Sequence, residues 1–322
     1  MSTEWNSLSL DSLGVLRARG ADVVSFLQGQ LSNDVALLGP ERSLLAGYHN
    51  PQGRVIALLR LVQASPGEVL AILPRELAAA AASRLAKFIL RAKVKVADES
   101  ASWQVTGLLA PESHADPAPP FTSALPDTLA LPDTLNDTVH MGDSIAVCIG
   151  ALPARWLVLS SVGARSANPP VAFAGCAPMQ LDRWRRLAVA AGEPEIYAAT
   201  SEEFVAQMLN LDVLGAIAFD KGCYTGQEVI ARAHYRGRVK RRLQRFVTHA
   251  PLRLEPGDAG ELSDGRAFKV VNAVPLADGR CEFLAVAPLA GDASAAGRSQ
   301  HEAERASVIN AQQLELPYSL PA

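Results

Sequence analysis

The chain has 322 residues, of which 49% are hydrophobic and 20% charged, and its formal net charge is −3. This length can hold two or three domains with real cores, and the composition is that of an ordinary folded protein, neither disordered nor fibrous. A net charge this small gives no global attraction to nucleic acid or to membranes.

The N-terminus and the cysteines set further limits. Residues 1–20 contain two acids and no apolar run, so they match neither a signal peptide nor a transit peptide. No run of about eighteen apolar residues occurs, so we expect no membrane-spanning helix. The cysteines form no C-x-x-C pair and predict no zinc site from local pairs; they are Cys148, Cys176, Cys223 and Cys281. We expect a cytoplasmic protein with free thiols.

The first half of the chain alternates helix and hairpin signals. Val23, Phe26 and Leu27 lie on the apolar side of a short helix predicted over 20–35, which Asn33-Asp34 end. The turn at 50–53 joins predicted strands. The elements expected up to residue 96 are strands over 44–48, 54–62 and 69–73, a helix over 74–90 with Leu77, Leu85, Phe88 and Ile89 on one side, and a strand from 94 to 96. This mixture indicates an α+β fold.

Residues 111–137 differ in composition from the rest of the chain. They are rich in proline, serine, threonine and aspartate, and they contain a near-repeat at 125–129 and 131–135. The pattern is typical of a mobile surface insertion.

The second half returns to regular structure. We expect strands over 144–149 and 156–160, a helix over 181–191 that ends at Gly192, and a helical segment over 201–209. From residue 243 onward, short strands alternate with turns at 255–257, 263–265 and 277–279, which indicates a small β-barrel. Residues 291–312 are mostly small and polar and predict a loop. We therefore divide the chain into 1–240 and a C-terminal barrel domain, 241–322.

The most informative motif is Lys221-Gly222-Cys223-Tyr224-Thr225-Gly226-Gln227-Glu228. Thr225 and Glu228 have the spacing of a capping box, so a helix is predicted to begin at this point. Cys223 would then lie just outside a helix N-terminus, whose partial positive charge favours a thiolate. This placement suggests chemistry or ligand contact at Cys223.

This segment has three other interpretations. Cys223 could be a buried structural thiol, although glycines and polar residues surround it. A cysteine hydrolase would pair Cys223 with His234 or His49, but no flanking signature supports such a pair. Residues 215–222 only superficially match a phosphate-binding loop, because Lys221 is not followed by Ser or Thr.

A basic run follows the motif, and no acid lies between Val229 and Arg245. Its members are Arg232, Arg236, Arg238, Lys240, Arg241, Arg242 and Arg245. The run could hold a polyanion such as RNA, phosphates or a polyglutamate tail, or it could be a solvated strand edge with protective charges.

The segment 218–228, followed by Ala231-Arg232, resembles the signature of the YgfZ-type folate-binding proteins, which belong to the superfamily of the glycine-cleavage T-protein, an aminomethyltransferase. The similarity extends to residues 26–35, 50–54 and 207–212 and to Leu316-Pro317-Tyr318. It covers nearly the whole chain apart from 111–137.

The resemblance implies a three-lobed, ring-like α+β body with a central folate pocket and a C-terminal β-barrel. It implies binding of tetrahydrofolate or a derivative within 1–240, and a role in assembling or repairing iron–sulphur clusters in client enzymes, including tRNA-modifying ones. Cys223 would be the functional thiol. The expected folate-binding residues are Lys221, Tyr224, Gln207, Gln227, Arg232 and Asn33. RNA contact is expected through Arg236, Arg238, Lys240, Arg241 and Arg242.

Two departures from the T-protein pattern bear on activity. T-proteins carry an Asp pair after the hairpin turn, whereas residues 53–58 of this chain contain no acid. The superfamily usually has a pterin-binding glutamate near the end of the helix before Gly192, and Ala190 stands at about that place. The missing carboxylate disfavours the alternative function, folate-dependent aminomethyl transfer, and Gln207 could compensate for Ala190.

Overall fold

The computed structural model describes residues 4–111, 131–151, 153–162, 176–237, 239–289 and 308–321. The chain forms two compact units. The first comprises Met1–Ala46 and Leu59–Leu181, and the second comprises Gly47–Leu58 and Asp182–Ala322. In the described ranges, no helix is both long and apolar enough to span a membrane.

The first unit holds a six-stranded sheet in the order β11-β1-β7-β10-β9-β8. The strands are β1 (Asn6–Ser9), β7 (Trp103–Leu109), β8 (Thr138–Met141), β9 (Ser144–Ala151), β10 (Ala154–Ser161) and β11 (Ala177–Pro178). All neighbours are antiparallel except β1 and β11. Trp5 and Trp156 pack on one another in its core, with ring centroids 5.5 Å apart.

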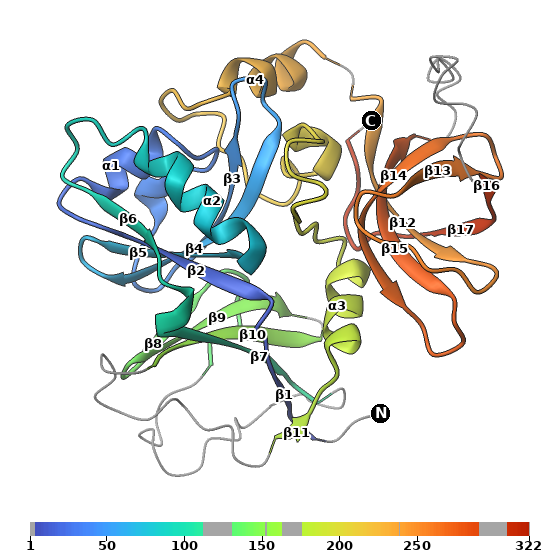
Figure 1. Cartoon of the computed structure of the whole chain (residues 1–322), viewed down its shortest axis with the longest axis horizontal. Helices are drawn as coiled ribbons and strands as arrows, with labels where there is room; N and C mark the ends of the chain where they lie inside the picture. Colours follow the sequence, from blue (N-terminus) through green and yellow to red (C-terminus); the bar gives the residue numbers. More distant parts are fainter. Residues whose placement is uncertain are drawn as a thin grey trace. The chain divides into compact units, whose positions relative to one another are not determined.

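A five-stranded sheet has the order β3-β4-β5-β2-β6. Its strands are β2 (Leu13–Arg19), β3 (Leu44–His49), β4 (Val55–Ser65), β5 (Glu68–Pro74) and β6 (Lys95–Asp98). The boundary between the two units falls within β3 and β4, so the hairpin at 47–58 belongs to the second unit. Helix α2 (Arg75–Ala86) covers β2 and β6 and buries Leu77, Ala81 and Leu85 (Figure 1).

The shorter elements correct several sequence-based expectations. Helix α1 spans only Val23–Gln28, because the chain turns at Gly29 and then forms the 3-10 turn η1 (Val35–Leu37). Helix α2 ends before Phe88, which is 50% exposed. The 3-10 turn η2 (Ser100–Ser102) precedes β7. The predicted helix over 201–209 is only the 3-10 turn η4 (Ala206–Leu209).

Part of the predicted surface insertion belongs to the core. Residues 112–130, including the first copy of the near-repeat, lie outside the described residues. Leu131 packs on two apolar clusters of the six-stranded sheet, and the Trp156 Nε1–H donates to the Pro132 carbonyl at 2.6 Å. The polar composition of 131–137 does not predict this packing, because Leu131 is the one large apolar side chain that the segment contributes to the core.

The second unit contains a curled sheet in the order β16-β13-β14-β15-β12-β17 (Figure 1). Its strands are β12 (Arg241–Thr248), β13 (Ala259–Leu262), β14 (Ala267–Pro275), β15 (Cys281–Pro288), β16 (Val308–Ile309) and β17 (Ala311–Leu314). The two edge strands, β16 and β17, are separated by Asn310 alone, so the edges of the sheet must approach each other and nearly close a barrel. Phe246, Phe268 and Phe283 fill the interior.

The barrel-like sheet confirms the expected C-terminal architecture, and β16 and β17 correct the predicted loop at its end. The expected loop 291–312 includes strand residues from Val308 onward, whereas 290–307 lie outside the described residues. The division into 1–240 and 241–322 stays a prediction. The same unit also holds α3 (Leu181–Ala190), which Gly192 follows with φ +67°, and α4 (Gln227–Tyr235).

Candidate functional site

Cys223 is the exposed cysteine of this chain. All four cysteines lie among the described residues and are free thiols. Cys148 and Cys281 are buried and Cys176 is half-buried, and burial raises the pKa of each of these three thiols. Cys223 is therefore the thiol that solvent, a ligand or a partner protein can reach.

The predicted capping box at Thr225 and Glu228 is wrong. Helix α4 begins at Gln227, and its N-cap is Gly226 in the left-handed conformation, with no side-chain cap hydrogen bond. Cys223 therefore lies four residues before the first helical residue. Because the field of a helix end falls off within about one turn, the helix start supports a thiolate at Cys223 less than the sequence suggested.

Two glycines hold the loop against the hairpin turn of the same unit. Gly226 and Gly53 have φ values of +82° and +71°. A Cβ on Gly226 would lie 2.5 Å from the Asn50 carbonyl oxygen, and one on Gly53 would lie 2.9 Å from Val229 Cβ. Both backbone conformation and space therefore require glycine at these two positions.

The hairpin turn is itself fixed by Asn50. Its Oδ1 accepts the N–H groups of Gln52 and Arg54, both at 3.0 Å, and its Nδ2 donates to Glu202 at 2.7 Å. The turn predicted at 50–53 is thus present, and it anchors the start of α4.

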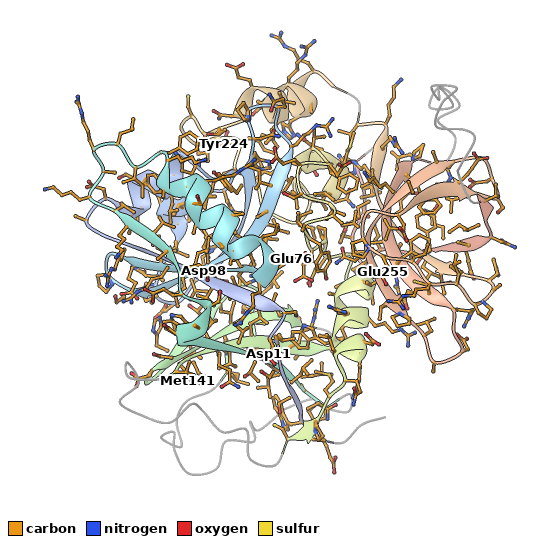
Figure 2. All side chains as sticks on the ribbon, viewed as in Figure 1. Asp11, Glu76, Asp98, Met141, Tyr224 and Glu255 are labelled. Carbon is orange, nitrogen blue, oxygen red and sulfur yellow. The ribbon has the colours of Figure 1, made fainter. Side chains whose placement is uncertain are left out.

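Tyr224 connects the exposed and the buried parts of this site. Its side chain is 7% exposed, and burial raises the pKa of its phenol to about 12. The Lys221 ammonium lies 5.1 Å from the centre of the Tyr224 ring, and the His49 ring centre lies 6.3 Å from it. Figure 2 labels Tyr224 beside the loop that leads into α4. Lys221, Cys223 and Tyr224 are therefore gathered on one loop, as the sequence predicted.

His49 is a buried imidazole whose two ring nitrogens have no hydrogen-bond partner among the described residues. It is 1% exposed, and burial lowers its pKa to about 4 from the ordinary 6.5. The backbone of Gly53 opposes this shift, but burial has the larger effect. His49 is therefore neutral near pH 7.

This burial predicts a pH-dependent stability. Between pH 6.5 and about 4 the unfolded state holds a proton on His49 that the folded state does not. The stabilisation that the folded protein gains from a neutral His49 is therefore complete above pH 6.5. By pH 5 the free energy of unfolding should have fallen by about 2 kcal/mol. Urea unfolding of the native protein and His49→Leu at pH 7.5 and 5 should show that the variant lacks this increment. His249→Leu, at an exposed site, should retain it; an equal pH dependence in native protein and His49→Leu would contradict the assignment.

Gln207 lies under α4. It is 1% exposed, its Nε2 donates to the Ile230 carbonyl at 2.7 Å, and its Oε1 has no partner among the described residues. Gln227 opens α4 and its backbone N–H donates to the Tyr224 carbonyl at 3.2 Å. Arg232 is exposed on the same helix. Five of the six predicted folate residues thus lie on or beside the segment 221–232, and the sixth is Asn33.

Asn33 belongs to the other compact unit and has a local structural role there. Its Nδ2 donates to the Leu45 carbonyl at 2.7 Å, and its Oδ1 accepts the Asp34 N–H at 2.8 Å. A ligand contact at Asn33 stays a prediction.

The predicted basic run does not form one continuous surface. Arg242 is 4% exposed and makes a bidentate pair with Asp212, with both N–O distances 2.9 Å. Arg245 pairs with Glu282, and an Arg241 Nη2–H donates to the Ala267 carbonyl. Strand β12 therefore places Arg241 against a carbonyl of the barrel, at Ala267, and Arg242 against Asp212, which precedes α4 in the chain. Arg236 and Lys240 are exposed, and Arg238 lies outside the described residues.

Sequence reasoning missed the buried network around Arg242. Arg242 also donates to the Gln207 carbonyl at 3.1 Å, and Asn210 Nδ2 donates to the Leu243 carbonyl at 3.0 Å. The Tyr318 hydroxyl donates to the Gly192 carbonyl at 2.7 Å. The network fixes the chain beneath α4 to β12. The resemblance at 207–212 and 316–318 marked two segments of this network in the sequence. It did not indicate which residues those segments contact.

No group of three or more His, Cys, Asp or Glu side chains that could hold a metal ion occurs in the part of the chain that the structure describes. Cys223 is the one thiol of the loop, whereas iron–sulphur clusters usually take four protein ligands. A resident cluster bound by this loop alone is therefore not supported.

Comparison with solved structures defines the class of fold. The glycine cleavage system aminomethyltransferase T from Bartonella henselae matches 89% of this chain and 79% of its own, with a TM-score of 0.68 and 14% identity. The chain thus has the aminomethyltransferase T-protein fold, as predicted. The heterotetrameric sarcosine oxidase from Corynebacterium sp. U-96, in complex with pyrrole 2-carboxylate, matches half of the chain with a TM-score of 0.35, which is too low to carry an argument.

Sequence comparison then identifies the family to which this chain belongs within that class of fold. No family model matches the chain. The tRNA-modifying protein YgfZ of Enterobacter sp. (strain 638) is 32% identical over 320 residues, which are 97% of this chain and 93% of the relative. The chain belongs to the YgfZ family.

Proposed function

We propose that this protein is a cytoplasmic, folate-binding accessory factor that supports assembly or repair of iron–sulphur clusters in client enzymes, including tRNA-modifying ones, with Cys223 as its functional thiol. The observation that carries the proposal is the exposure of Cys223 on a loop fixed by Gly53 and Gly226, while the other three thiols are buried or half-buried. Membership of a family that contains a tRNA-modifying protein supports the RNA-linked part.

The cluster is cargo in this proposal. A Cys223 thiolate would form one bond to an iron atom, and the client enzyme or a carrier would supply the remaining ligands. The exchange replaces one thiolate ligand by another, so no electrons are transferred. An exposed cysteine on a fixed loop suits such a transient contact better than a permanent site.

A folate fits the polar groups of the second unit. Among the described residues, the Gln207 Oε1 and the two ring nitrogens of His49 are buried without partners. The edge of a pterin ring carries N–H donors for the Gln207 oxygen and the accepting nitrogen of neutral His49, and acceptors for the His49 N–H. In this proposal Gln207 and Gln227 hold the pterin edge, Tyr224 packs on the ligand, and Lys221 binds a carboxylate of its tail. The folate would place its ring next to the loop that carries Cys223.

A thermal-shift titration with tetrahydrofolate tests this binding. Because the ligand binds the native state, a concentration about 100-fold above Kd should add about 2.7 kcal/mol to the free energy of unfolding and raise the midpoint. Lys221→Ala should reduce the shift, and Arg253→Ala, which removes an exposed arginine of the barrel, should not. An unchanged midpoint at millimolar tetrahydrofolate would refute folate binding.

A further inference from the structure

At the end of α4, His234 and Tyr235 cluster with Phe219 of the preceding loop, and the proposed function does not use these three aromatic rings. The Phe219 and His234 rings are nearly parallel, 18° apart, with centroids separated by 3.7 Å. Tyr235 lies edge-on to both, with centroid distances of 6.1 Å to Phe219 and 4.7 Å to His234. We call these three residues the aromatic stack.

The aromatic stack faces solvent. Tyr235 is 65% exposed, His234 is exposed and Phe219 is half-buried. The contact between Phe219 and His234 ties the start of the Cys223 loop to the end of α4, which is a structural role. That role does not need Tyr235, whose ring stays largely in water, and stacked exposed rings are typical of recognition surfaces.

Two arginines without partners flank the stack. Arg232 lies in the last turn of α4 and Arg236 is its C-cap, four residues on. Like charges at this spacing are unfavourable by about 0.2–0.5 kcal/mol. Glu228 has the right spacing to pair with Arg232, yet neither arginine forms an ion pair or side-chain hydrogen bond with any residue that the structure describes. An external anion would remove this repulsion.

We infer that the aromatic stack, with Arg232 and Arg236, binds unpaired bases of single-stranded RNA. Bases would stack on the exposed rings, and the two guanidiniums would contact the phosphates. An acidic peptide would use the charges but would leave the exposed ring of Tyr235 without a planar partner. The inference deepens the RNA-linked part of the proposed function, on which it rests.

The location of the stack links it to Cys223. Phe219 and Cys223 are four residues apart, so their Cα atoms lie within about 14 Å even in an extended chain. RNA bound on the stack would therefore lie near the thiol loop, where a tRNA-modifying client would present both its RNA and its cluster.

Fluorescence anisotropy with a 12-nucleotide, fluorescein-labelled single-stranded oligo(A) RNA tests the inference on the full chain. The affinity should fall with salt with a log–log slope of about −1.4, for two phosphate contacts at about 0.7 each. Tyr235→Ala should weaken binding about 5- to 150-fold, the loss of about 1–3 kcal/mol from one base stack. Tyr235→Phe should bind within about twofold of the native protein because it keeps the ring. Arg236→Ala should lower the slope by about 0.7.

Three results would overturn the inference. The first is no measurable affinity for the RNA probe at an ionic strength of about 20 mM, where screening is weak. The others are equal RNA affinity of Tyr235→Ala and native protein, or tighter binding of a polyglutamate peptide than of the RNA. Tyr235 is exposed, so its variants should keep the native thermal midpoint. The tetrahydrofolate shift is measured without RNA. Loss of RNA binding with an intact folate shift would therefore refute this inference alone, whereas a missing folate shift would refute the folate part of the proposed function.

Discussion

Replacing Cys223 by alanine should abolish the ability of this protein to support iron–sulphur enzyme activity in cells, while its stability stays within about 0.5 kcal/mol of the native value. The side chain is exposed, so its loss removes a reactive group and little packing. The measurement is the activity of an iron–sulphur enzyme in cells that carry the variant as their only copy. Cys176→Ala, which removes a half-buried thiol elsewhere, is the matched control and should retain activity. Full activity of Cys223→Ala would end the proposed role of this thiol.

The same paired variants can be tested with a chemical probe. In the native protein, iodoacetamide should modify Cys223 first, because the other three thiols are buried or half-buried and burial raises their pKa values. After denaturation all four should react. Mass spectrometry of the alkylated protein would show one rapid addition, which Cys223→Ala should lack and Cys176→Ala should retain.

Replacing Asp212 by alanine should cost about 3–5 kcal/mol of unfolding free energy, because it leaves the buried Arg242 guanidinium without its carboxylate. Urea unfolding measures the loss. Glu255→Ala, which breaks the solvent-exposed pair with Arg253, is the control and should have little effect. The double variant Asp212→Leu with Arg242→Met should recover much of the loss, because it removes both charges together. A cost of less than about 1 kcal/mol in Asp212→Ala would show that water reaches Arg242.

Folate-dependent aminomethyl transfer remains the rival function. Val55, Ile56, Ala57 and Leu58 are buried and apolar, and the stretch offers no carboxylate to handle a proton at a folate nitrogen. An assay for methylene-tetrahydrofolate formed from an aminomethyl donor should therefore give no product above background.

Local patterns in the sequence predicted local structure well. The turn at 50–53 follows from its asparagine and glycine, and the prominence of Cys223 follows from its polar, glycine-rich surroundings. The family signature also led to the T-protein fold. Each of these depends on residues that are close together along the chain.

Features that depend on distant residues could not be predicted. In the sequence, Arg242 is one member of a basic run. Its partner Asp212 lies thirty residues earlier, and only the folded chain brings the two side chains together. The spacing of Thr225 predicts a cap, because sequence alone does not show that Gly226, in the left-handed conformation and close to the Asn50 carbonyl, is the N-cap. Nothing in the sequence around His49 shows that both its nitrogens are buried without partners.

The composition of the second unit has a consequence for synthesis. This unit needs the hairpin at 47–58, made early in translation, and also β17 and Tyr318, made more than 250 residues later. The strands of the hairpin pair early within the five-stranded sheet, but its contacts with Phe204, Val205 and Val229 wait until those residues are made, and the unit is complete only after Tyr318. Such a long delay between the first and last parts of one core exposes apolar strands to aggregation, so this half of the molecule should depend on chaperones for folding more than its length alone would suggest.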